Sequence, residues 1–419
     1  MVESDFLKSY RVRITPLTPV HVGSGEILEP YQYVLKNHEV WILNLTKLIN
    51  ILPEAAAGEY LEAIERGPFE ARRRLGQLAE RFDLESAVAW RAPAAPGFEN
   101  FLDQALQRGR GELGIRIFPS ALEGPYLPGS SLKGAIRTTI LFDVSRTKLK
   151  VDFDDELMEW VGKKDYIWKQ RGKRLSHGQW HLEEQGEGRI RPPFALRRPR
   201  RGEKREALPI NQKYEATALD VTFDKGKPVI HSDPFRALAV SDSGPLPSTQ
   251  FHLVEVYGSG KDPSSPTGIV QLAQVWSKGP VEANLRFHTG QLGHKDSAIR
   301  RSAKPLGGQL AGLAQSAYER LINLAEAELY EYDRRGWSEA AEAMERVLDA
   351  IEDCLNEDGA LKKPYRFPLR IGYGSSELSM RLSEFIEYSG PKGKERIAPI
   401  SRKLSEKLPM GWVMVSVIE

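Results

Sequence analysis

The chain has 419 residues, too many for one ordinary hydrophobic core, and fits two domains or one domain with large insertions. Its net charge of +2 does not by itself indicate a polyanionic partner, so local charge clusters matter more. A single cysteine, Cys354, excludes an intrachain disulfide framework and a zinc site built on paired cysteines. Neither a secretory signal nor an apolar run of about 20 residues is visible, so we expect a cytoplasmic protein.

In the first part of the chain, strand patterns alternate with helical ones. Alternating side chains predict a strand at residues 10–15, and residues 40–43 and 115–118 also have strand-like composition. Helical patterns cover residues 46–88 and 101–108. In the longer helical stretch we expect Thr46 as a cap and breaks at Pro53, Gly58 and Gly67.

A basic insertion at about residues 152–206 separates these elements from the second half, in which residues 258–267 predict a loop. Two amphipathic helices are expected in the helical segment 310–355, and the last strands at 369–371 and 412–418. Strands interleaved with helices in both halves predict an α+β fold. We favour tandem ferredoxin-like (βαββαβ) domains with large insertions, at residues 1–225 and 226–419.

Residues 126–137, YLPGSSLKGAIR, predict a tight turn followed by a helix with phosphate-binding potential. Free N–H groups at a helix start favour a phosphate, and Lys133 and Arg137 would flank it on one helical face. Local chemistry alone favours a capped helix without a ligand, and the order of a nucleotide P-loop is absent. The candidate residues are Gly129, Ser130, Ser131, Lys133, Gly134 and Arg137.

Two further turns, HVGSGE at residues 21–26 and RIGYG at residues 370–374, have a similar composition. Glycine- and serine-rich turns after strands offer backbone donors without side-chain bulk. Taken alone, each turn favours a hairpin with permissive residues, and His21 alone favours a structural histidine over a catalyst. The candidate residues are His21, Gly23, Ser24, Gly25, Arg370, Gly372 and Gly374.

Basic residues concentrate between residues 189 and 205, where Glu203 is the one acidic residue. Basic side chains neutralise phosphates, and a solvated loop is the structural alternative. The acidic segment 310–355 makes this a segregation of charge, which favours a polyanionic partner. The candidate residues in this basic loop are Arg197, Arg198, Arg200 and Arg201.

Taken together, these motifs resemble the RAMP proteins of type III CRISPR effector complexes. LTPVHVGSGE at residues 17–26, followed by YQYV at 31–34, looks like their amino-terminal signature, and YLPGSSLKGAIRT at 126–138 like their central one. The ending LPMGWV at 408–413 and the internal VSDS at 240–243 are most similar to subunit five of type III-A (Csm) complexes.

The resemblance implies RRM-like, ferredoxin-type domains that hold a guide RNA (crRNA) through its backbone and shape. It implies a position at the crRNA 3′ end, where the subunit caps the filament and supports assembly and 3′ maturation by helping to recruit host nucleases. The implied partners are crRNA, target RNA and the neighbouring Csm backbone and small subunits, without a membrane. No catalytic residue, metal or cofactor is implied.

The backbone subunit of such complexes cleaves target RNA with an aspartate in the loop after its first glycine turn, but residues 30–38 contain no aspartate. This departure favours a non-catalytic RNA-binding subunit. One alternative is a RAMP endoribonuclease acting on crRNA precursor or target RNA, with His21 as its general base. Another is an assembly cap that contacts only protein.

Overall fold

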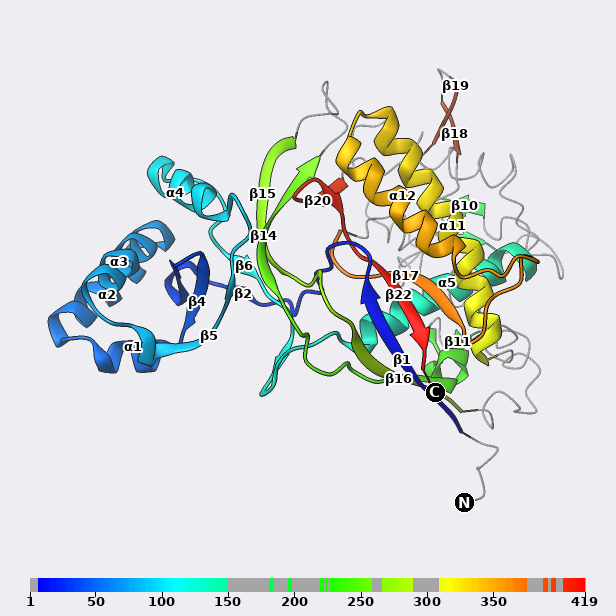
Figure 1. The fold of residues 1–419 in the computed structure, drawn as a ribbon, viewed down its shortest axis with the longest axis horizontal. Helices are drawn as coiled ribbons and strands as arrows, with labels where there is room; N and C mark the ends of the chain where they lie inside the picture. Colours follow the sequence, from blue (N-terminus) through cyan, green and yellow to red (C-terminus); the bar gives the residue numbers. More distant parts are fainter. Residues whose placement is uncertain are drawn as a thin grey trace.

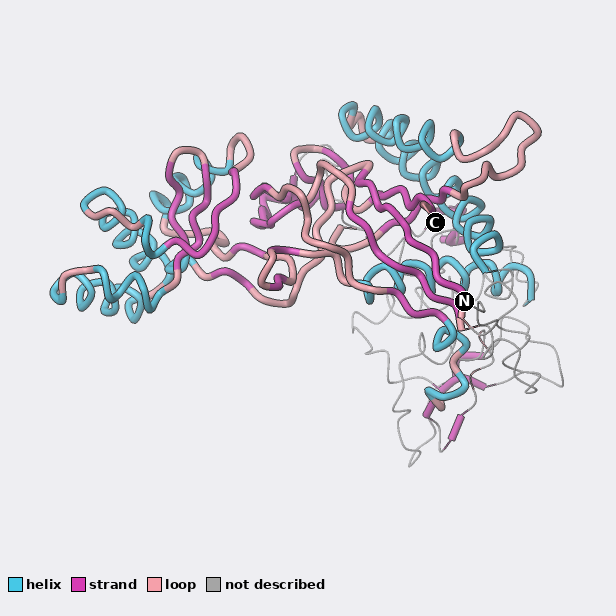
Figure 2. The backbone as a smooth tube through the Cα atoms, turned by 60° about the horizontal axis from the view of Figure 1, so that its bottom comes forward, coloured by secondary structure: helices cyan, strands magenta, loops and turns pink. Residues whose placement is uncertain are grey.

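A computed structural model describes residues 7–148, 181–183, 195–197, 219, 221, 223–224, 227–257, 266–288, 309–374, 387–390, 393–396 and 402–418. The molecule is elongated, with a small helical lobe at one end, a six-stranded sheet in the middle and a helix-covered five-stranded sheet beyond it (Figures 1 and 2). This mixture of helices and antiparallel sheets confirms the predicted α+β class. Most of the predicted insertion at 152–206 lies outside the described residues.

The five-stranded sheet joins strands from both ends of the chain. β1 lies at its centre and pairs antiparallel with β16 on one side and β22 on the other, in the order β13-β16-β1-β22-β17. Val12 and Ile14 alternate with charged residues along β1, and both are buried because their face of the sheet is covered by helices. The strands are β1 (Lys8–Pro16), β13 (Leu238–Val240), β16 (Val281–Phe287), β17 (Arg366–Arg370) and β22 (Trp412–Val417).

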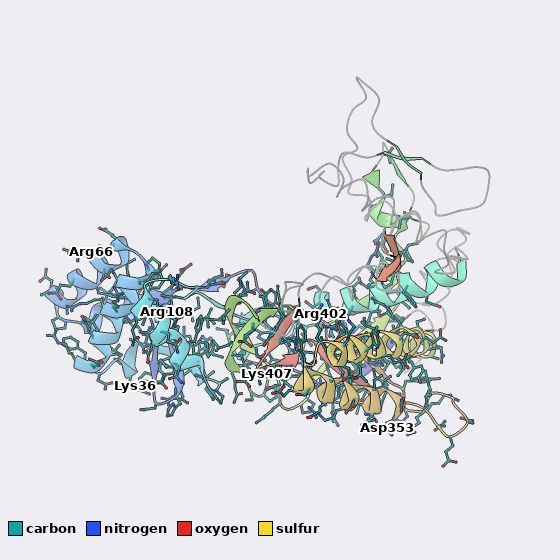
Figure 3. The ribbon with its side chains drawn as sticks, turned by 90° about the horizontal axis from the view of Figure 1, so that it is seen from above. Lys36, Arg66, Arg108, Asp353, Arg402 and Lys407 are labelled. Carbon is teal, nitrogen blue, oxygen red and sulfur yellow. The ribbon has the colours of Figure 1, made fainter. Side chains whose placement is uncertain are left out.

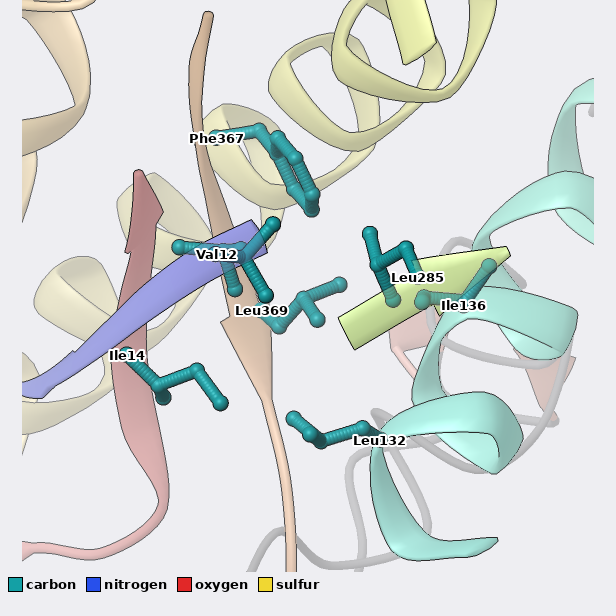
Figure 4. A pocket seen from close by; sticks show the side chains of 8 residues that line it. Val12, Ile14, Leu132, Ile136, Leu285, Phe367 and Leu369 are labelled. Atoms are coloured by element: carbon teal, nitrogen blue, oxygen red, sulfur yellow. The ribbon is translucent and has the colours of Figure 1, made fainter. Parts of the chain in front are cut away.

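Three helices accompany this sheet: α5 (Gly129–Lys148), α11 (Gln309–Arg334) and α12 (Ser338–Glu352). Leu132 and Ile136 of α5 face the sheet across an apolar cavity of about 10 Å³ (Figure 4), which is too small for an organic ligand. α11 packs into the same core, and α12 folds back along it. In chain order β1, α5, β13, β16, α11 and β22 run strand, helix, strand, strand, helix, strand.

The six-stranded sheet has the order β2-β6-β15-β14-β20-β21, with a parallel pairing between β6 and β15 and antiparallel pairings elsewhere. One face packs Phe251 and Leu272 against Phe98 and Leu102 of helix α4 (Phe98–Arg108). The hairpin of β14 and β15 was not predicted, and part of the expected loop at 258–267 belongs to β15. The strands are β2 (Ile27–Leu28), β6 (Ile115–Arg116), β14 (Gln250–Tyr257), β15 (Pro266–Val275), β20 (Arg402–Ser405) and β21 (Leu408–Pro409).

The N-terminal lobe packs three helices on the small sheet β3-β4-β5. The predicted break at Gly58 is wrong: α2 continues through it, because burial of Ala57 and Tyr60 offsets a helical glycine's cost of about 1 kcal/mol. The cap of α1 is Asn44, not Thr46, and it accepts from Lys47 N at 3.0 Å. The elements are η1 (Pro30–Gln32), β3 (Tyr33–Lys36), β4 (Glu39–Leu43), α1 (Leu45–Ile51), α2 (Glu54–Arg66), α3 (Pro68–Arg81), η2 (Glu85–Ala87), β5 (Val88–Pro93) and α4 (Phe98–Arg108).

Short elements complete the described structure. None of the helices in the described ranges combines the length and apolar character that a membrane span needs. Figure 3 shows Lys36, Arg66 and Arg108 in the N-terminal lobe and Asp353 near the opposite end. The short elements are β7 (Ser120–Ala121), β8 (Gly124–Pro125), β9 (His181–Glu183), β10 (Ala195–Arg197), β11 (Phe223–Asp224), β12 (Lys227–Pro228), η4 (Ile230–Ser232), η5 (Pro234–Ala237), β18 (Glu387–Gly390) and β19 (Gly393–Arg396).

Candidate functional site

The two glycine turns from opposite ends of the chain lie in backbone contact. Tyr373 N donates to His21 O at 2.7 Å, and Gly411 N donates to Pro19 O at 2.8 Å. Ile371 N in turn donates to Gly411 O at 2.8 Å. Three motifs that are far apart in sequence therefore form one structural unit. We call it the turn cluster, which comprises residues 18–25, 371–374 and 409–411.

Two glycines of the turn cluster are required by close backbone approach. Gly372 has φ +76°, and a Cβ there would collide with the carbonyl oxygen of His21. Gly411 has φ +96°, and a Cβ there would collide with the carbonyl oxygen of Ile371. Side chains other than hydrogen are thus excluded twice, by space and by the left-handed conformation. These glycines let the turns meet.

His21 is buried beneath the turn cluster. Its Nδ1 lies 2.6 Å from the carbonyl oxygen of Gln274, and its ring packs edge-on against Phe118 and Tyr373. A carbonyl oxygen only accepts, so Nδ1 must hold the proton and the neutral ring presents a lone pair at Nε2. That Nε2 is buried and has no hydrogen-bond partner among the residues that the structure describes.

Burial, together with the smaller effects of the nearby cations Arg116 and Lys403, lowers the pKa of His21 to about 4, against the opposing effect of the Gln274 carbonyl. The ring is therefore neutral at pH 7. A base of such low pKa, without solvent contact at Nε2, is poorly suited to take a proton from RNA. The exposed part of this turn is instead Gly23, Ser24 and Gly25.

Arg370 occupies a different place from the one predicted. Its side chain is buried and forms an ion pair with Glu328 of α11, whose carboxylate also accepts from Trp412 Nε1 at 3.2 Å. The guanidinium donates to Met410 O at 3.3 Å and to Gly374 O at 3.2 Å. Arg370 thus joins α11 to two of the turns from inside, and this placement gives no support to a direct RNA contact.

At the start of α5, a protein carboxylate lies where a phosphate was expected. Gly129 N donates to Asp242 Oδ1 at 2.8 Å, and Leu127 N donates to Ser243 Oγ at 2.9 Å. A Cβ at Gly129 would collide with the carbonyl oxygens of Val240 and Ser241. The motif at 240–243 therefore fits around the Pro-Gly turn of the central motif and caps its helix.

The predicted cations on α5 differ in their environments. Arg137 makes two hydrogen bonds to the carboxylate of Asp233, at 2.8 and 3.0 Å, and lies over the Phe235 ring. Lys133 forms no ion pair with the residues that the structure describes, and burial lowers its pKa despite nearby Asp233. Gly134 and Ser130 are exposed on this helix, and Ser131 is half-buried.

The predicted basic loop lies almost entirely outside the described residues. Arg198, Arg200 and Arg201 lie outside the described residues, and of Arg197 only the backbone, paired in β10, is described. Within the described ranges, no three histidine, cysteine or acidic side chains are grouped as a metal site would require.

Sequence reasoning missed the residues that hold these motifs in place. Asp242 and Ser243 belong to a motif that was noticed, but its pairing with Gly129 was not predictable from spacing. Tyr373 lies in the glycine turn at 370–374 that was noticed, but its own role was not predicted. Gln274 and Glu328 carry no sequence signal that separates them from ordinary strand or helix residues. Only their long-range contacts in the structure identify these residues as supports of the motifs.

A family model described as the RAMP superfamily matches residues 13–376, most of the chain. The chain belongs to the RAMP superfamily, which confirms the resemblance predicted from its motifs. The match includes the end of β1, the central motif at the start of α5 and both glycine turns.

The relatives found bear the name of the predicted subunit. The Csm5 protein of Streptococcus thermophilus is 26% identical over 137 residues, which is 32% of this chain and only 38% of the relative's length. The crystal structure of T. onnurineus Csm5 has a TM-score of 0.57 and 18% identity, and the alignment covers 96% of this chain and 99% of that one.

A chain from the cryo-EM structure of a type III-A Csm–crRNA–target RNA ternary complex has a TM-score of 0.61 and 19% identity. The alignment covers 98% of this chain and all of that one. Both alignments thus show a likeness in fold that is not confined to one sheet or lobe.

Proposed function

We propose that this chain is a non-catalytic, RNA-binding subunit of a type III-A (Csm) CRISPR complex. It caps the backbone filament at the crRNA 3′ end and supports assembly and crRNA 3′ maturation. The observation that carries the proposal is the turn cluster, in which motifs from both ends of a RAMP chain meet through glycine-only approaches. The type of complex is inferred from the names of the similar proteins, which are Csm5 and a chain of a Csm–crRNA–target RNA assembly.

The crRNA contacts we propose are the exposed Gly23, Ser24 and Gly25 of the turn cluster and Lys133 of α5. At Gly25 an added Cβ would meet nothing within 4 Å, so an RNA backbone has room to approach. Lys133 supplies a cation without an ion-pair partner among the described residues. Arg137 is paired with Asp233, so it would bind a phosphate beside Lys133 only if its guanidinium shared this pairing with the phosphate or released the carboxylate.

The fold proposed for this role is a tandem of ferredoxin-like, RRM-like units. Support for one of them comes from the five-stranded sheet, in which β13-β16-β1-β22 with α5 and α11 follow the βαββαβ order. β17 then extends this unit at its edge. The second unit would be built around the six-stranded sheet.

The endoribonuclease alternative is less well supported. Its general base would be His21, whose buried neutral ring is fixed by the Gln274 carbonyl. The segment after the first glycine turn, which holds no aspartate, is ordered as η1 and the hairpin β3–β4. To test catalysis, the purified chain is incubated with crRNA precursor and target RNA, with and without magnesium. Cleavage that is lost in His21→Ala would overturn the non-catalytic proposal.

The proposal is tested by purifying the tagged chain from cells that express the other Csm subunits and a CRISPR array. We expect crRNA and the backbone subunit to copurify, and complexes made without this chain to hold crRNA with altered 3′ ends. Recovery of the chain without RNA would contradict it. Recovery with Csm subunits but without any crosslink to RNA would favour the assembly-cap alternative.

A matched pair of variants tests the proposed phosphate contact. Lys133→Gln should weaken crRNA retention and lower the salt dependence of RNA binding by about 0.7 in slope, the value for one phosphate of a single strand. Lys278→Gln, at an exposed position on the connection before β16, should leave both unchanged. Equal behaviour of the two variants would remove Lys133 from the RNA contacts.

A further inference from the structure

One face of the six-stranded sheet gathers cations and apolar side chains around Tyr373. Residues directly opposite one another on paired strands share a face, as do alternate residues along a strand. Arg116 of β6 lies opposite Ile27 of β2 and Ala273 of β15, and Gln271 is two residues from Ala273. These side chains therefore project from the same face.

The same face continues across the next two strands. Gln271 pairs with Val254 on β14, and Val256 pairs with Lys403 on β20. Arg116 and Lys403 thus stand on one face of the sheet, separated by β15 and β14. In Figure 1 this sheet lies between the N-terminal lobe and the five-stranded sheet.

Tyr373 of the turn cluster covers the middle of this face. It packs with the cluster formed by Val254, Ala273, Val275 and Met410, and its hydroxyl donates to Gln271 Oε1. Lys403 Nζ lies 3.5 Å from the centre of its ring, and the guanidinium of Arg116 lies 5.6 Å from it. The Tyr373 ring thus has two cations close to it and lies beside the exposed first glycine turn.

The charges on this face are incompletely neutralised. Arg116 pairs with Glu112 at 3.1 Å, whereas Lys403 has the Tyr373 ring and no carboxylate partner among the described residues. Two large apolar side chains are exposed in addition: Ile27 at 42% and Ile269 at 54%. A partner with negative charge and flat apolar surfaces matches this combination, and single-stranded RNA has both, as phosphates and bases.

We propose that this face binds a single-stranded segment of the crRNA, with a base against Tyr373 and phosphates at Lys403 and Arg116. The proposal rests on the RNA-binding function proposed above and extends it to residues outside the predicted set. The two cations leave the Tyr373 ring for phosphates, and the ring then stacks on the base. The exposed Ile27 and Ile269 cover neighbouring bases.

The experiment measures fluorescence anisotropy of labelled oligouridylate with the purified full-length chain. Tyr373→Leu should weaken binding about tenfold through loss of stacking, while Tyr373→Phe, which keeps the ring, should bind like the wild type. The double variant Arg116→Gln, Lys403→Gln should lower the slope of log affinity against log salt by about 1.4, or about 0.7 for each phosphate. Thermal melting confirms that the variants are folded.

The matched control is the double variant Lys47→Gln, Arg66→Gln, which removes the same charge from the N-terminal lobe. It should keep the wild-type affinity and slope. An equal loss in this control would mean that only net charge matters, and would overturn the proposal.

Two other outcomes separate the proposals. If the wild type binds RNA but the Tyr373 and cation variants bind equally well, the sheet face is wrong and the RNA-binding function stands. If those variants bind RNA normally but no longer copurify with a Csm subunit, the face is a protein contact, which also overturns the inference. Failure of the wild type to bind RNA, alone or in a complex, overturns both.

Discussion

Gly129 and Gly134 lie five residues apart on α5, and the structure gives them opposite environments. At Gly129 a Cβ would collide with the carbonyl oxygens of Val240 and Ser241, which belong to a backbone segment that cannot swing aside like a side chain. At Gly134 an added Cβ would meet nothing within 4 Å. The sequence pattern marked both glycines, but only the first makes a contact that requires one.

This contrast predicts stability changes of opposite sign. Gly129→Ala should destabilise the protein by at least about 2 kcal/mol, because either the Pro-Gly turn or the 240–243 segment must shift. Gly134→Ala should stabilise it by about 0.5–1 kcal/mol, because alanine loses less backbone entropy in a helix. Urea unfolding of both variants tests this, and a neutral Gly129→Ala would show that the close approach is not required.

The buried His21 predicts a pH dependence of stability. Its pKa falls from 6.5 to about 4 on folding, so the unfolded chain takes up the proton first as the pH drops. The contribution of His21 is therefore complete above pH 6.5 and is lost progressively as the pH falls towards 4, amounting to about 3 kcal/mol. Unfolding free energies measured from pH 7 to pH 4 should fall less steeply in His21→Gln than in the wild type.

Two other histidines bear on this measurement, one as a second source of pH dependence and one as a control. Burial also lowers the pKa of His252 to about 4, so the variant keeps part of the pH dependence in the same window. His38 is exposed, with 88% of its side chain accessible, and His38→Gln serves as the matched control for the removal of a surface histidine. Parallel profiles for His21→Gln and the wild type would mean that His21 titrates normally in the folded protein.

The burial of Arg370 and its pairing with Glu328 could not be predicted from the sequence pattern. From the sequence, an arginine beside a glycine turn in a suspected RNA-binding chain is a natural phosphate ligand. Its burial depends on Glu328, which lies 42 residues earlier on α11 and is itself fully buried. No local pattern links the two, whereas the glycines at 372 and 374 were found because their conformation is a local requirement.

At the scale of elements, the Arg370–Glu328 pair fastens α11 to the turn cluster. Removing one partner leaves the other charge buried, which typically costs about 3–5 kcal/mol. We therefore expect Arg370→Met to destabilise the protein by this amount and the double variant Arg370→Met, Glu328→Leu to recover part of the loss. The midpoints of urea unfolding measure both effects.

The control for this pair is the exposed ion pair of Lys362 with Asp353, at 2.9 Å. Lys362→Met should change stability far less than Arg370→Met, because both charges remain in water. If the double variant at the buried site is less stable than both single variants, the two side chains do not act as a compensating pair.

Elements with strong periodic patterns were predictable, and elements defined by distant pairing were not. The amphipathic patterns located α11, α12, β1, β4 and β22 to within a few residues. The hairpin of β14 and β15 was missed, because its polar and apolar residues do not alternate cleanly where two faces are differently buried. Its neighbours β6 and β20 lie more than 100 residues away along the chain.

At the scale of the whole molecule, the division into domains depends on which strands pair with one another and not only on which strands are present. The predicted boundary at residue 225 places β1 on one side and its neighbours β16 and β22 on the other. The number and limits of the domains stay a prediction, because a sequence pattern identifies strands and not their partners. The α+β class was predictable, since it depends only on which elements are present.

Dividing the chain at residue 225 tests whether β1 needs its partner strands from the second half of the chain. Fragments 1–225 and 226–419, expressed together, should copurify through one tag, because β1 inserts between two strands of the other fragment and otherwise exposes both edges. Ile14→Asp in the first fragment should abolish recovery, because Ile14 is fully buried in the joint core. If fragment 1–225 alone unfolds cooperatively as a soluble monomer, β1 does not need these partners, and the strand order proposed for the ferredoxin-like unit is wrong.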